Sequence, residues 1–333
     1  MTKILFVDGS DLHEGVRFSM IRYQNEMLKA LSSDSFTTNV FKLKIYYFKI
    51  LTIIANNIKL FFLSKHFDYV VLVDHSDALH TLFCSRRKRV IVVHDLIMLD
   101  TNDWARKCYR GLIYRVIANS TILFFASQIT RELFIKRFDW HGTSLVLSPC
   151  VEINDQKKRN VDRTKSQKIR VLFVGNDNEY KNRRHIFELI HYAGRNSLPI
   201  EFVLITPELG EHDAADFACY SNNTFLSNVS EEKIQEEYNA ADILVVPSLN
   251  EGFGWHCIEA IASGCVVLST ANGGLIESVK SDVYISGNDC LETYKAIVKV
   301  IANRSKYLEL QLANIQQYET VVFRNKIREF FHD

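Results

Sequence analysis

The sequence predicts an α/β protein made of two doubly wound domains. Its 333 residues exceed the size of one typical core and suit two domains of about 150 residues each. Both halves alternate short apolar runs with longer helical stretches, which is typical of a parallel sheet covered by helices. With 47% hydrophobic and 24% charged residues, the composition is that of a globular protein and excludes a disordered one.

The elements follow in order along the chain. The first domain, 1–150, begins with a strand at 4–7 and a helix from about 19 to 31, and its later apolar runs predict strands at 70–73, 90–93 and 121–125. A polar, charged stretch over 151–168 predicts an interdomain linker. The second domain, 169–317, has predicted strands at 169–175, 202–205, 243–246 and 266–268.

The stretch 247–260 is the most informative part of the chain. Glu251 follows a predicted buried strand, Gly252 and Gly254 allow a close backbone approach to a ligand, and Glu259 falls about two turns into the helix that follows. Where a parallel strand hands over to a helix, backbone N–H groups and the helix dipole face the carboxyl edge of the sheet. The pattern therefore predicts a site for a phosphorylated ligand.

These residues resemble the signature of a known family. Glu251 and Glu259, followed by Ser-Gly-Cys-Val-Val from Ser263 and by Gly-Gly-Leu-Ile-Glu from Gly273, resemble retaining glycosyltransferases of family 4 (glycosyl transferases group 1). The resemblance implies the GT-B fold, in which two Rossmann-like domains face each other across a cleft. The first domain would bind the acceptor, the second would bind a nucleotide sugar, and a final helix, about 318–333, would cross back to the first domain.

The resemblance also implies roles for the residues of the loop. Glu259 would accept hydrogen bonds from the ribose diol of the donor, and Glu251 would contact hydroxyls of the transferred sugar. The backbone amides of Phe253, Gly254 and Trp255 would lie near the phosphates or the sugar. Glu251 would position and support the sugar electrostatically and need not act as a covalent nucleophile.

A second loop would bind the donor diphosphate. Lys181 and Asn182 match the family's Lys-Asn step, so Lys181 is implied as a phosphate ligand. The Arg that the family usually places just before this step is missing. Arg183 or Arg184 would supply the second cation, or both would lie on a solvated helix face; the sequence leaves both interpretations open.

Two residues of the first domain are further candidates. His94 ends a predicted buried strand in a His-Asp-Leu step that resembles family members transferring mannose and related sugars, so it would meet the donor sugar; the alternative is a simply packed histidine. Gly15 lies in the loop after the first strand, where the family contacts the diphosphate and the acceptor. This loop is not a Gly-x-Gly-x-x-Gly fingerprint, so it gives a nicotinamide dehydrogenase no support.

The resulting functional hypothesis is a metal-independent retaining transfer. A sugar would move from a UDP- or GDP-sugar, with His-Asp-Leu favouring GDP-mannose, to a hydroxyl of a glycan or lipid-linked acceptor in cell-surface polysaccharide or lipopolysaccharide synthesis. No cofactor beyond the donor substrate is expected. The alternative hypothesis is a noncatalytic GT-B relative that binds a nucleotide sugar or serves as an interaction subunit.

Charge and cysteine patterns predict the surroundings of the protein. Residues 36–67 contain no acidic side chain and interleave lysines with aromatic and aliphatic residues, which suits either an anionic membrane surface or a core-facing helix with solvated lysines. No recognisable nucleic-acid module accompanies this charge, so nucleic acid is not the expected partner. Seven scattered cysteines without a Cys-x-x-Cys pair predict small core residues in a reducing compartment and no structural zinc. The expected location is cytoplasmic, with peripheral attachment at the inner face of the membrane.

Overall fold

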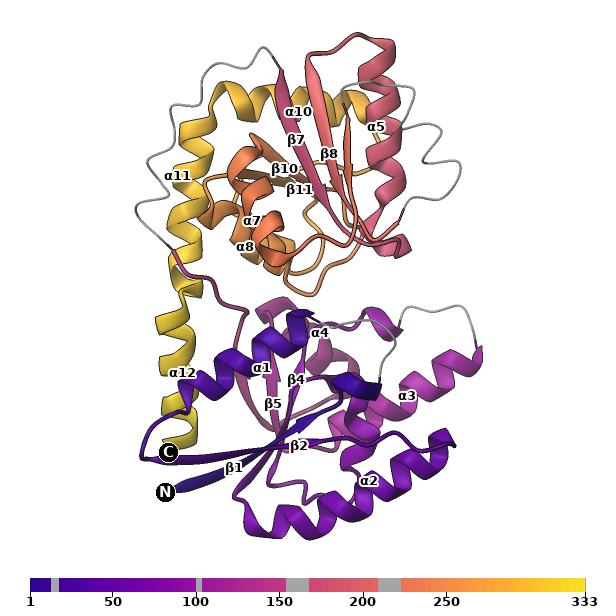
Figure 1. Cartoon of the computed structure of the whole chain (residues 1–333), viewed down its shortest axis with the longest axis vertical. Helices are drawn as coiled ribbons and strands as arrows, with labels where there is room; N and C mark the ends of the chain where they lie inside the picture. The colour runs from indigo at the N-terminus through magenta and orange to yellow at the C-terminus, as the bar shows by residue number, and fades with distance from the viewer. Residues whose placement is uncertain (13–17, 100–103, 154–167, 209–222, 333) are drawn as a thin grey trace. The chain divides into compact units, whose positions relative to one another are not determined.

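The structure, a computed structural model, describes residues 1–12, 18–99, 104–153, 168–208 and 223–332. The chain forms two units, one of Met1–Pro149 with Thr320–Asp333 and one of Cys150–Glu319. Each unit has its own parallel sheet, and Figure 1 labels the elements. Residues 154–167, the main part of the predicted linker, lie outside the described residues.

Within its described residues, the first unit has a six-stranded parallel sheet in the order β2-β1-β3-β4-β5-β6. The strands are β1 (Thr2–Asp8), β2 (Phe36–Lys42), β3 (Tyr69–Leu72), β4 (Arg89–Val93), β5 (Ile122–Phe125) and β6 (Thr143–Val146). The order reverses between β1 and β3. Crevices for ligands form at such switch points, beyond the carboxyl ends of the strands.

Helices cover both faces of this sheet. They are α1 (Phe18–Ala30), α2 (Lys49–Leu63), α3 (Trp104–Ala118), α4 (Gln128–Phe138) and α12 (Thr320–His332). Successive strand residues point to opposite faces: Leu5 and Val7 enter the core cluster that also contains residues of α2, α3 and α4. The C-terminal helix α12 packs beside α1, and its Phe331 ring meets Phe124 of β5. Both faces of the sheet are therefore buried, as parallel sheets require.

The second unit repeats this architecture. Its described sheet has five parallel strands in the order β11-β10-β7-β8-β9. The strands are β7 (Ile169–Val174), β8 (Ile200–Ile205), β9 (Thr224–Leu226), β10 (Ile243–Val246) and β11 (Val266–Ser269), and the helices are α5 (Arg183–Arg195), α7 (Glu231–Ala240), α8 (Trp255–Ala262), α9 (Leu275–Ser278), α10 (Cys290–Ala302) and α11 (Arg304–Ile315). The order reverses between β7 and β10, which places the switch point of this sheet there.

The edge strand β11 is protected by a side chain of α11. The buried amide of Gln311 accepts a hydrogen bond from Val267 N at 3.0 Å and donates one to Val267 O at 2.7 Å. A bare edge would offer these backbone groups to another chain. Gln311 satisfies them within the unit.

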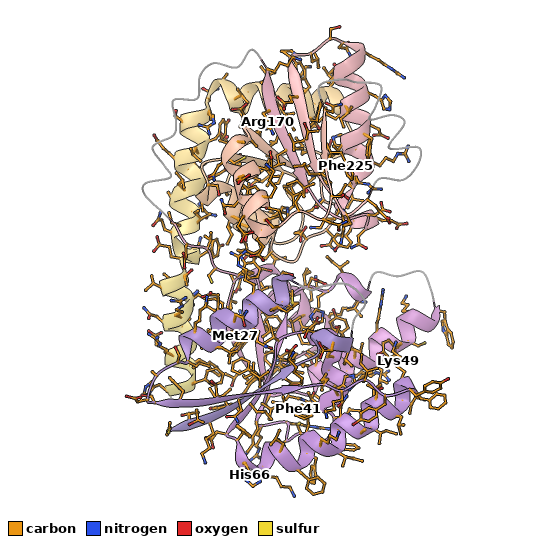
Figure 2. The ribbon with its side chains drawn as sticks, viewed as in Figure 1. Met27, Phe41, Lys49, His66, Arg170 and Phe225 are labelled. Carbon is orange, nitrogen blue, oxygen red and sulfur yellow. The ribbon has the colours of Figure 1, made fainter. Side chains whose placement is uncertain are left out.

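The predicted fold class is confirmed as two parallel-sheet α/β units, but three strands were not predicted. β2, β6 and β9 lie away from the switch points and carry few buried apolar residues, so their sequences lack the continuous apolar run of an inner strand. Figure 2 places Phe41 on β2 and Lys49 at the start of α2. The interpretation of 36–67 as one amphipathic segment is therefore wrong for 36–42, which pairs with β1.

Two further expectations can be compared with the described residues. The prediction that the cysteines are small core residues is wrong for Cys108, which is exposed on α3. Cys290, at the start of α10, is only partly buried. Among the helices described, none combines the length and the apolar character needed to span a bilayer.

Candidate functional site

The loop between β10 and α8 carries Glu251 and is shaped by glycines. Gly254 caps α8 with φ at +87°, a left-handed conformation that a residue with a Cβ rarely adopts. Glu251 lies in the loop before it. Glu259 is the fifth residue of α8, so it lies in the second turn and closer to the helix start than the sequence predicted.

A second glycine pair holds this loop from the side. Gly274 N donates to Glu251 O at 2.8 Å. A Cβ on Gly273 would lie 2.2 Å from Glu251 O, and one on Gly274 would lie 2.2 Å from Gly252 O. Only glycine permits this backbone contact, which explains the Gly-Gly step after β11. The pair fixes the direction in which the Glu251 loop leaves β10.

Lys181 reaches Glu251 from the neighbouring strand. It ends a 3₁₀ turn, Glu179–Lys181, after β7, and its Nζ lies 2.7 Å from Glu251 Oε2, with both side chains 14% exposed. β7 and β10 are neighbours at the switch point, so a parallel sheet brings the two loops together there. The structure thus brings these two charges together in the second unit.

Hydrogen bonds tie the two loops to each other. Leu249 N donates to Tyr180 O at 2.7 Å. Asn182, in the left-handed conformation with φ at 52°, donates from Nδ2 to Pro247 O at 3.1 Å and to Gly287 O at 2.7 Å. The role of Asn182 in the Lys-Asn step is thus to join three segments. It positions Lys181.

The charge pair is stable in its ionised form. Burial opposes the charged carboxylate of Glu251, but the ammonium of Lys181 and its hydrogen bond outweigh burial and lower the pKa of Glu251. Burial likewise opposes the charged Lys181, but Glu251 outweighs it and raises the pKa of the ammonium. Both groups are therefore charged at neutral pH.

His256 lies next to this pair and was not among the predicted site residues. Burial, reinforced by the nearby Lys181 ammonium, lowers the pKa of His256 from 6.5 to about 4. Burial also raises the pKa of Cys257 well above its ordinary value. At neutral pH both side chains are uncharged. The signal in the sequence was the unusual Trp-His-Cys step at the start of α8.

This histidine should make the fold sensitive to mild acid. The unfolded chain gains a proton on His256 as the pH falls below about 6.5, whereas the folded chain resists until about 4. Stability is thus lost as the pH falls, by about 2 kcal/mol between pH 7 and pH 5. Urea unfolding at both pH values should show a smaller loss for His256→Gln. His141→Gln, at an exposed position, should behave as the wild type, and an equal loss in all three proteins would contradict this assignment.

One part of the chain matches a known family model. Residues 154–313 match the family model Glycosyl transferases group 1. The second unit thus contains a glycosyltransferase group 1 domain, and the Lys181–Glu251 pair lies inside it.

Curated relatives match only part of the chain. D-inositol 3-phosphate glycosyltransferase from Geodermatophilus obscurus is 43% identical over 83 residues, which is 24% of this chain and 18% of that protein. The protein of the same name from Mycolicibacterium gilvum is 39% identical over 80 residues, again 24% and 18%. The chain therefore spans less than a fifth of the length of these two relatives.

Solved structures resemble the whole chain. Sucrose-phosphate synthase from Thermosynechococcus elongatus has a TM-score of 0.76 at 14% identity and covers 100% of this chain and 98% of its own. Anabaena Alr3699/HepE in complex with UDP-glucose has a TM-score of 0.75 at 15% identity and covers 100% of both chains. At such identities the likeness concerns the fold, which is that of GT-B glycosyltransferases.

Other predicted donor residues of the group 1 domain have structural partners of their own. Phe253 is buried and packs edge-to-face on Tyr318, with ring centroids 4.9 Å apart. Trp255 donates from Nε1 to Cys150 O at 2.9 Å. Both side chains are therefore engaged within the second unit.

The two arginines after Lys181 differ sharply. Arg183 is buried; it pairs with Asp177 at 2.6 Å and donates to Glu208 O at 2.8 Å. Arg184 is 87% exposed and pairs with Glu188. The interpretation of a solvated helix face is therefore wrong for Arg183 and holds for Arg184. Arg183 braces the loops that follow β7 and β8.

The candidates of the first unit lie at its own sheet edge. His94 follows β4, is buried, and donates from Nε2 to the carbonyl of Val73 at 2.7 Å. Its ring packs edge-to-face on Tyr23 at 5.2 Å. His94 is thus anchored within the first unit. Gly15 lies outside the described residues.

A small hollow, with an enclosed volume of about 20 Å³, lies at the switch point of the first unit. Its lining comes from the ends of β1 and β3 and from α1, and includes Asp8, Asp74 and Asp77. A Cβ on Gly9 would lie 1.9 Å from Asp77 Oδ2, so a larger residue after β1 would require the Asp77 side chain to move. Carboxylates at such an edge are suited to accept hydrogen bonds from hydroxyl groups.

Proposed function

We propose that the protein is a retaining glycosyltransferase that moves a sugar from a UDP- or GDP-sugar to a hydroxyl of a glycan or lipid-linked acceptor. The observation that carries this proposal is the buried Lys181–Glu251 pair at the switch point of the group 1 domain. The UDP-glucose complex of Alr3699/HepE, a protein of the same fold, supports a nucleotide-sugar donor.

Lys181 would act on the leaving group. In an oxocarbenium-like transition state, negative charge grows on the departing diphosphate, and donors fixed in advance stabilise it more than the ground state. An ammonium has three N–H donors; one reaches Glu251, so two remain for phosphate oxygens. The amides at the start of α8 would add to this charge stabilisation. We assign it to these groups rather than to a metal ion.

The carboxylates would bind hydroxyl groups. Glu251 is held by Lys181 and by the Gly273–Gly274 pair, so its oxygens have a fixed direction toward the transferred sugar. Glu259, in the second turn of α8, would accept hydrogen bonds from the ribose diol. Transfer would thus depend on positioning and electrostatics, with the leaving phosphate assisting removal of the acceptor proton.

A ligand screen tests the donor assignment. The melting temperature Tm should be measured with UDP, GDP and ADP in turn. At about 100 times its dissociation constant, the correct nucleotide should raise Tm by about 5–10 °C, because it binds only the folded state. The matching sugar nucleotide should then release its diphosphate when acceptor is present. Failure of all three nucleotides to bind would remove the proposal.

One observation favours the alternative, a noncatalytic relative. Arg183 is engaged by Asp177 and Glu208, so the second cation expected for the diphosphate has another task in this structure. The alternative predicts nucleotide-sugar binding with no diphosphate release over any acceptor. Measured turnover would exclude it.

We also propose that the first unit rests on an anionic membrane through α2. The inward side chains of this helix include the polar Thr52, Asn56 and Asn57 beside Leu60, while many of its apolar side chains are exposed. Asn56 and Asn57 satisfy their amides on the backbone of Lys44, Leu79 and Phe83.

The outward face of α2 combines apolar area with positive charge. Its exposed apolar residues are Ile50, Leu51, Ile54, Ile58, Phe61 and Phe62. Lys49 and Lys59 lie over tyrosine rings, and Lys65 lies 4.4 Å from the ring centre of Phe61. In a helix that lies in the membrane interface, lysines flank an apolar stripe that becomes buried among the lipids. The protein would thus work at the cytoplasmic face of a membrane, near a lipid-linked acceptor.

Vesicle binding tests this surface. The protein should sediment with vesicles containing phosphatidylglycerol, and Ile54→Asp with Ile58→Asp should weaken binding by about tenfold or more, because two apolar anchors become charged. Val321→Asp, at an exposed apolar position of α12, is the matched control and should bind as the wild type. Equal binding by all three proteins would show that α2 does not bind the membrane. A dimer that the double variant abolishes would show that this face instead contacts a second copy of the chain.

A further inference from the structure

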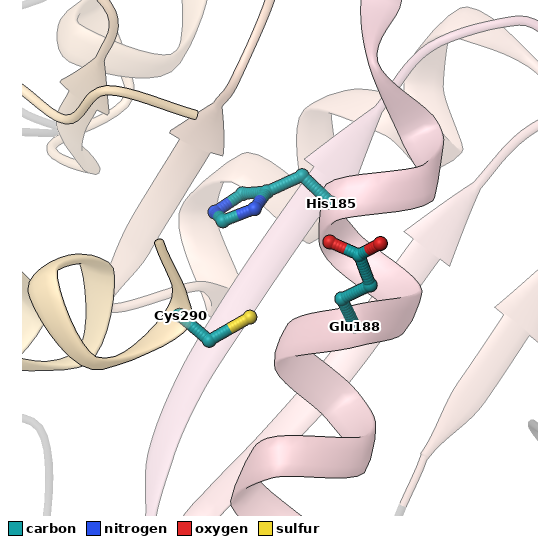
Figure 3. Close-up of side chains that lie close together, drawn as sticks. All are labelled: His185, Glu188 and Cys290. Carbon is teal, nitrogen blue, oxygen red and sulfur yellow. The ribbon is translucent and has the colours of Figure 1, made fainter. Parts of the chain in front are cut away.

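A second cluster of reactive side chains lies away from the Lys181 loop, between α5 and α10. His185 and Glu188 are one turn apart on α5, and Cys290 is the first residue of α10. Among the described residues searched, one ligand atom from each of the three lies within 4.8 Å of the others. Figure 3 shows the three side chains converging from the two helices.

The imidazole of His185 is buried, and its environment selects one tautomer. His185 is 1% exposed, and its Nε2 lies 2.9 Å from Thr293 Oγ1. The Thr293 hydroxyl donates its own hydrogen to Asp289 O at 2.9 Å, so its oxygen must accept from Nε2–H. The lone pair is therefore on Nδ1, and this buried atom has no hydrogen-bond partner in the described part of the chain.

A lone pair held in this way needs an electrophilic partner. A buried acceptor without a partner costs about 1–3 kcal/mol, so such atoms are rare without a purpose. A hydrogen bond from one ring nitrogen, which leaves the other ready, is the usual support of a metal-ligating histidine. Here the imidazole lies close to a thiol and a carboxylate.

We propose that His185 Nδ1, Cys290 Sγ and a carboxylate oxygen of Glu188 form a site for one divalent transition-metal ion, with Zn²⁺ as the best chemical match. Nitrogen, thiolate and carboxylate are the zinc ligands of proteins, and three of them leave the fourth tetrahedral position for water. The site does not depend on the proposed transfer reaction.

The geometry needs only a small adjustment. Ligand atoms around a tetrahedral zinc ion lie about 3.3–3.8 Å apart, somewhat closer than the cluster in this structure. The side chain of Glu188 is 43% exposed, and Arg184 engages only its Oε1, so it can turn toward the ion. Asp289 and Glu292 add negative charge around His185 and favour a cation.

Binding would change one proton. Burial, together with Glu188 and Asp289, raises the pKa of the Cys290 thiol, so without metal it is protonated at neutral pH. Burial lowers the pKa of His185, which is therefore neutral and ready to ligate. On binding, Cys290 loses its proton to solvent and ligates as the thiolate, so one proton is released per ion.

The ion would brace the loop that carries Lys181. α5 starts two residues after Lys181, and Asn182 already bonds Gly287 O, three residues before Cys290. Joining the first turns of α5 and α10 would restrain both ends of that contact. This site was not predictable from sequence, because its three residues come from two helices far apart in the chain and include a single cysteine.

Titration with Co²⁺, followed by Zn²⁺ competition, tests the site on the full chain. We expect one ion per chain, a near-ultraviolet thiolate-to-cobalt band, release of one proton, and a Tm raised by several degrees with Zn²⁺. Cys290→Ser should abolish the band, and Glu188→Gln should weaken binding by about tenfold or more. Cys108→Ser, at an exposed cysteine, is the matched control and should bind as the wild type.

Thr293→Val tests whether His185 ligates the metal ion or merely lies near it. It keeps the shape of the side chain but removes the oxygen that accepts from Nε2–H, so binding should weaken by about 10–100-fold. Circular dichroism and urea unfolding without metal would establish that each variant is folded. Uptake that is unchanged in Cys290→Ser and Glu188→Gln would reflect scattered surface groups only and would overturn the proposal.

Discussion

Lys181→Ala is expected to lower kcat for sugar transfer by about 10²–10³-fold, the usual effect of removing one donor that stabilises charge in a transition state. The ammonium is fixed 2.7 Å from Glu251 by the loop after β7, at the switch point of the group 1 domain. It therefore needs no rearrangement when charge appears on the leaving diphosphate. Initial rates of diphosphate release with the nucleotide sugar found by the ligand screen would measure the loss.

Stability must be separated from catalysis in this variant. Removing Lys181 alone leaves the Glu251 carboxylate buried without its cation, which costs about 3–5 kcal/mol. The double variant Lys181→Met with Glu251→Gln removes both charges and keeps the volumes. It should regain most of the stability while transfer stays lost.

Arg184→Ala is the matched control, since it removes a solvated cation three residues away and should leave both quantities nearly unchanged. Wild-type turnover in Lys181→Ala would show that this ammonium is not part of the reaction.

Gly274→Ala is expected to lower the free energy of unfolding by about 3 kcal/mol and to weaken donor binding at least tenfold. The added methyl carbon would lie 2.2 Å from Gly252 O and 2.6 Å from Phe253 Cα, and both are backbone atoms that cannot rotate away. The loop carrying Glu251 would have to shift. Urea unfolding and nucleotide titration would measure the two effects.

The chain offers a control for this substitution. Gly111 lies within α3, and a Cβ there would meet nothing within 4 Å. Gly111→Ala should stabilise the protein by about 0.5–1 kcal/mol, because alanine has the higher helix propensity and loses less chain entropy on folding. If Gly274→Ala were as stable as Gly111→Ala, the close backbone contact would have no role in shaping the loop.

The inner strands were predictable because burial on both faces leaves a simple pattern. Apart from Arg89 at the start of β4 and Arg170 in β7, the strands β4, β7 and β10 are apolar, and their sequences predicted them to within about a residue. β2 is a half-exposed edge strand with Thr37, Thr38 and Asn39 at its centre, and it is a strand only because β1 pairs with it. No local property of 36–42 carries that information.

The candidate site likewise contains residues that local sequence signals predicted and residues that they did not. Glu251 and Lys181 were predicted because glycines, a Lys-Asn step and strand ends are local signals. The lowered pKa of His256, about 4, was not predicted, because it arises from burial and from the nearby Lys181, a residue of another loop. For Arg183 the sequence left open a phosphate contact or a solvated helix face, yet in the structure Asp177, Thr206 and Glu208 surround it.

By itself, the sequence determined the periodic features of this protein: two alternating α/β halves, the strand-to-helix turns, and the glycines that only particular backbone conformations require. Tertiary structure alone decided which distant groups meet: Lys181 with Glu251, Gln311 with the edge of β11, and His185 with Cys290. The physical reason is that hydrophobic periodicity and backbone conformation are local properties. Charge pairing, burial and the pKa shifts that follow depend on neighbours that only the packed sheets bring together.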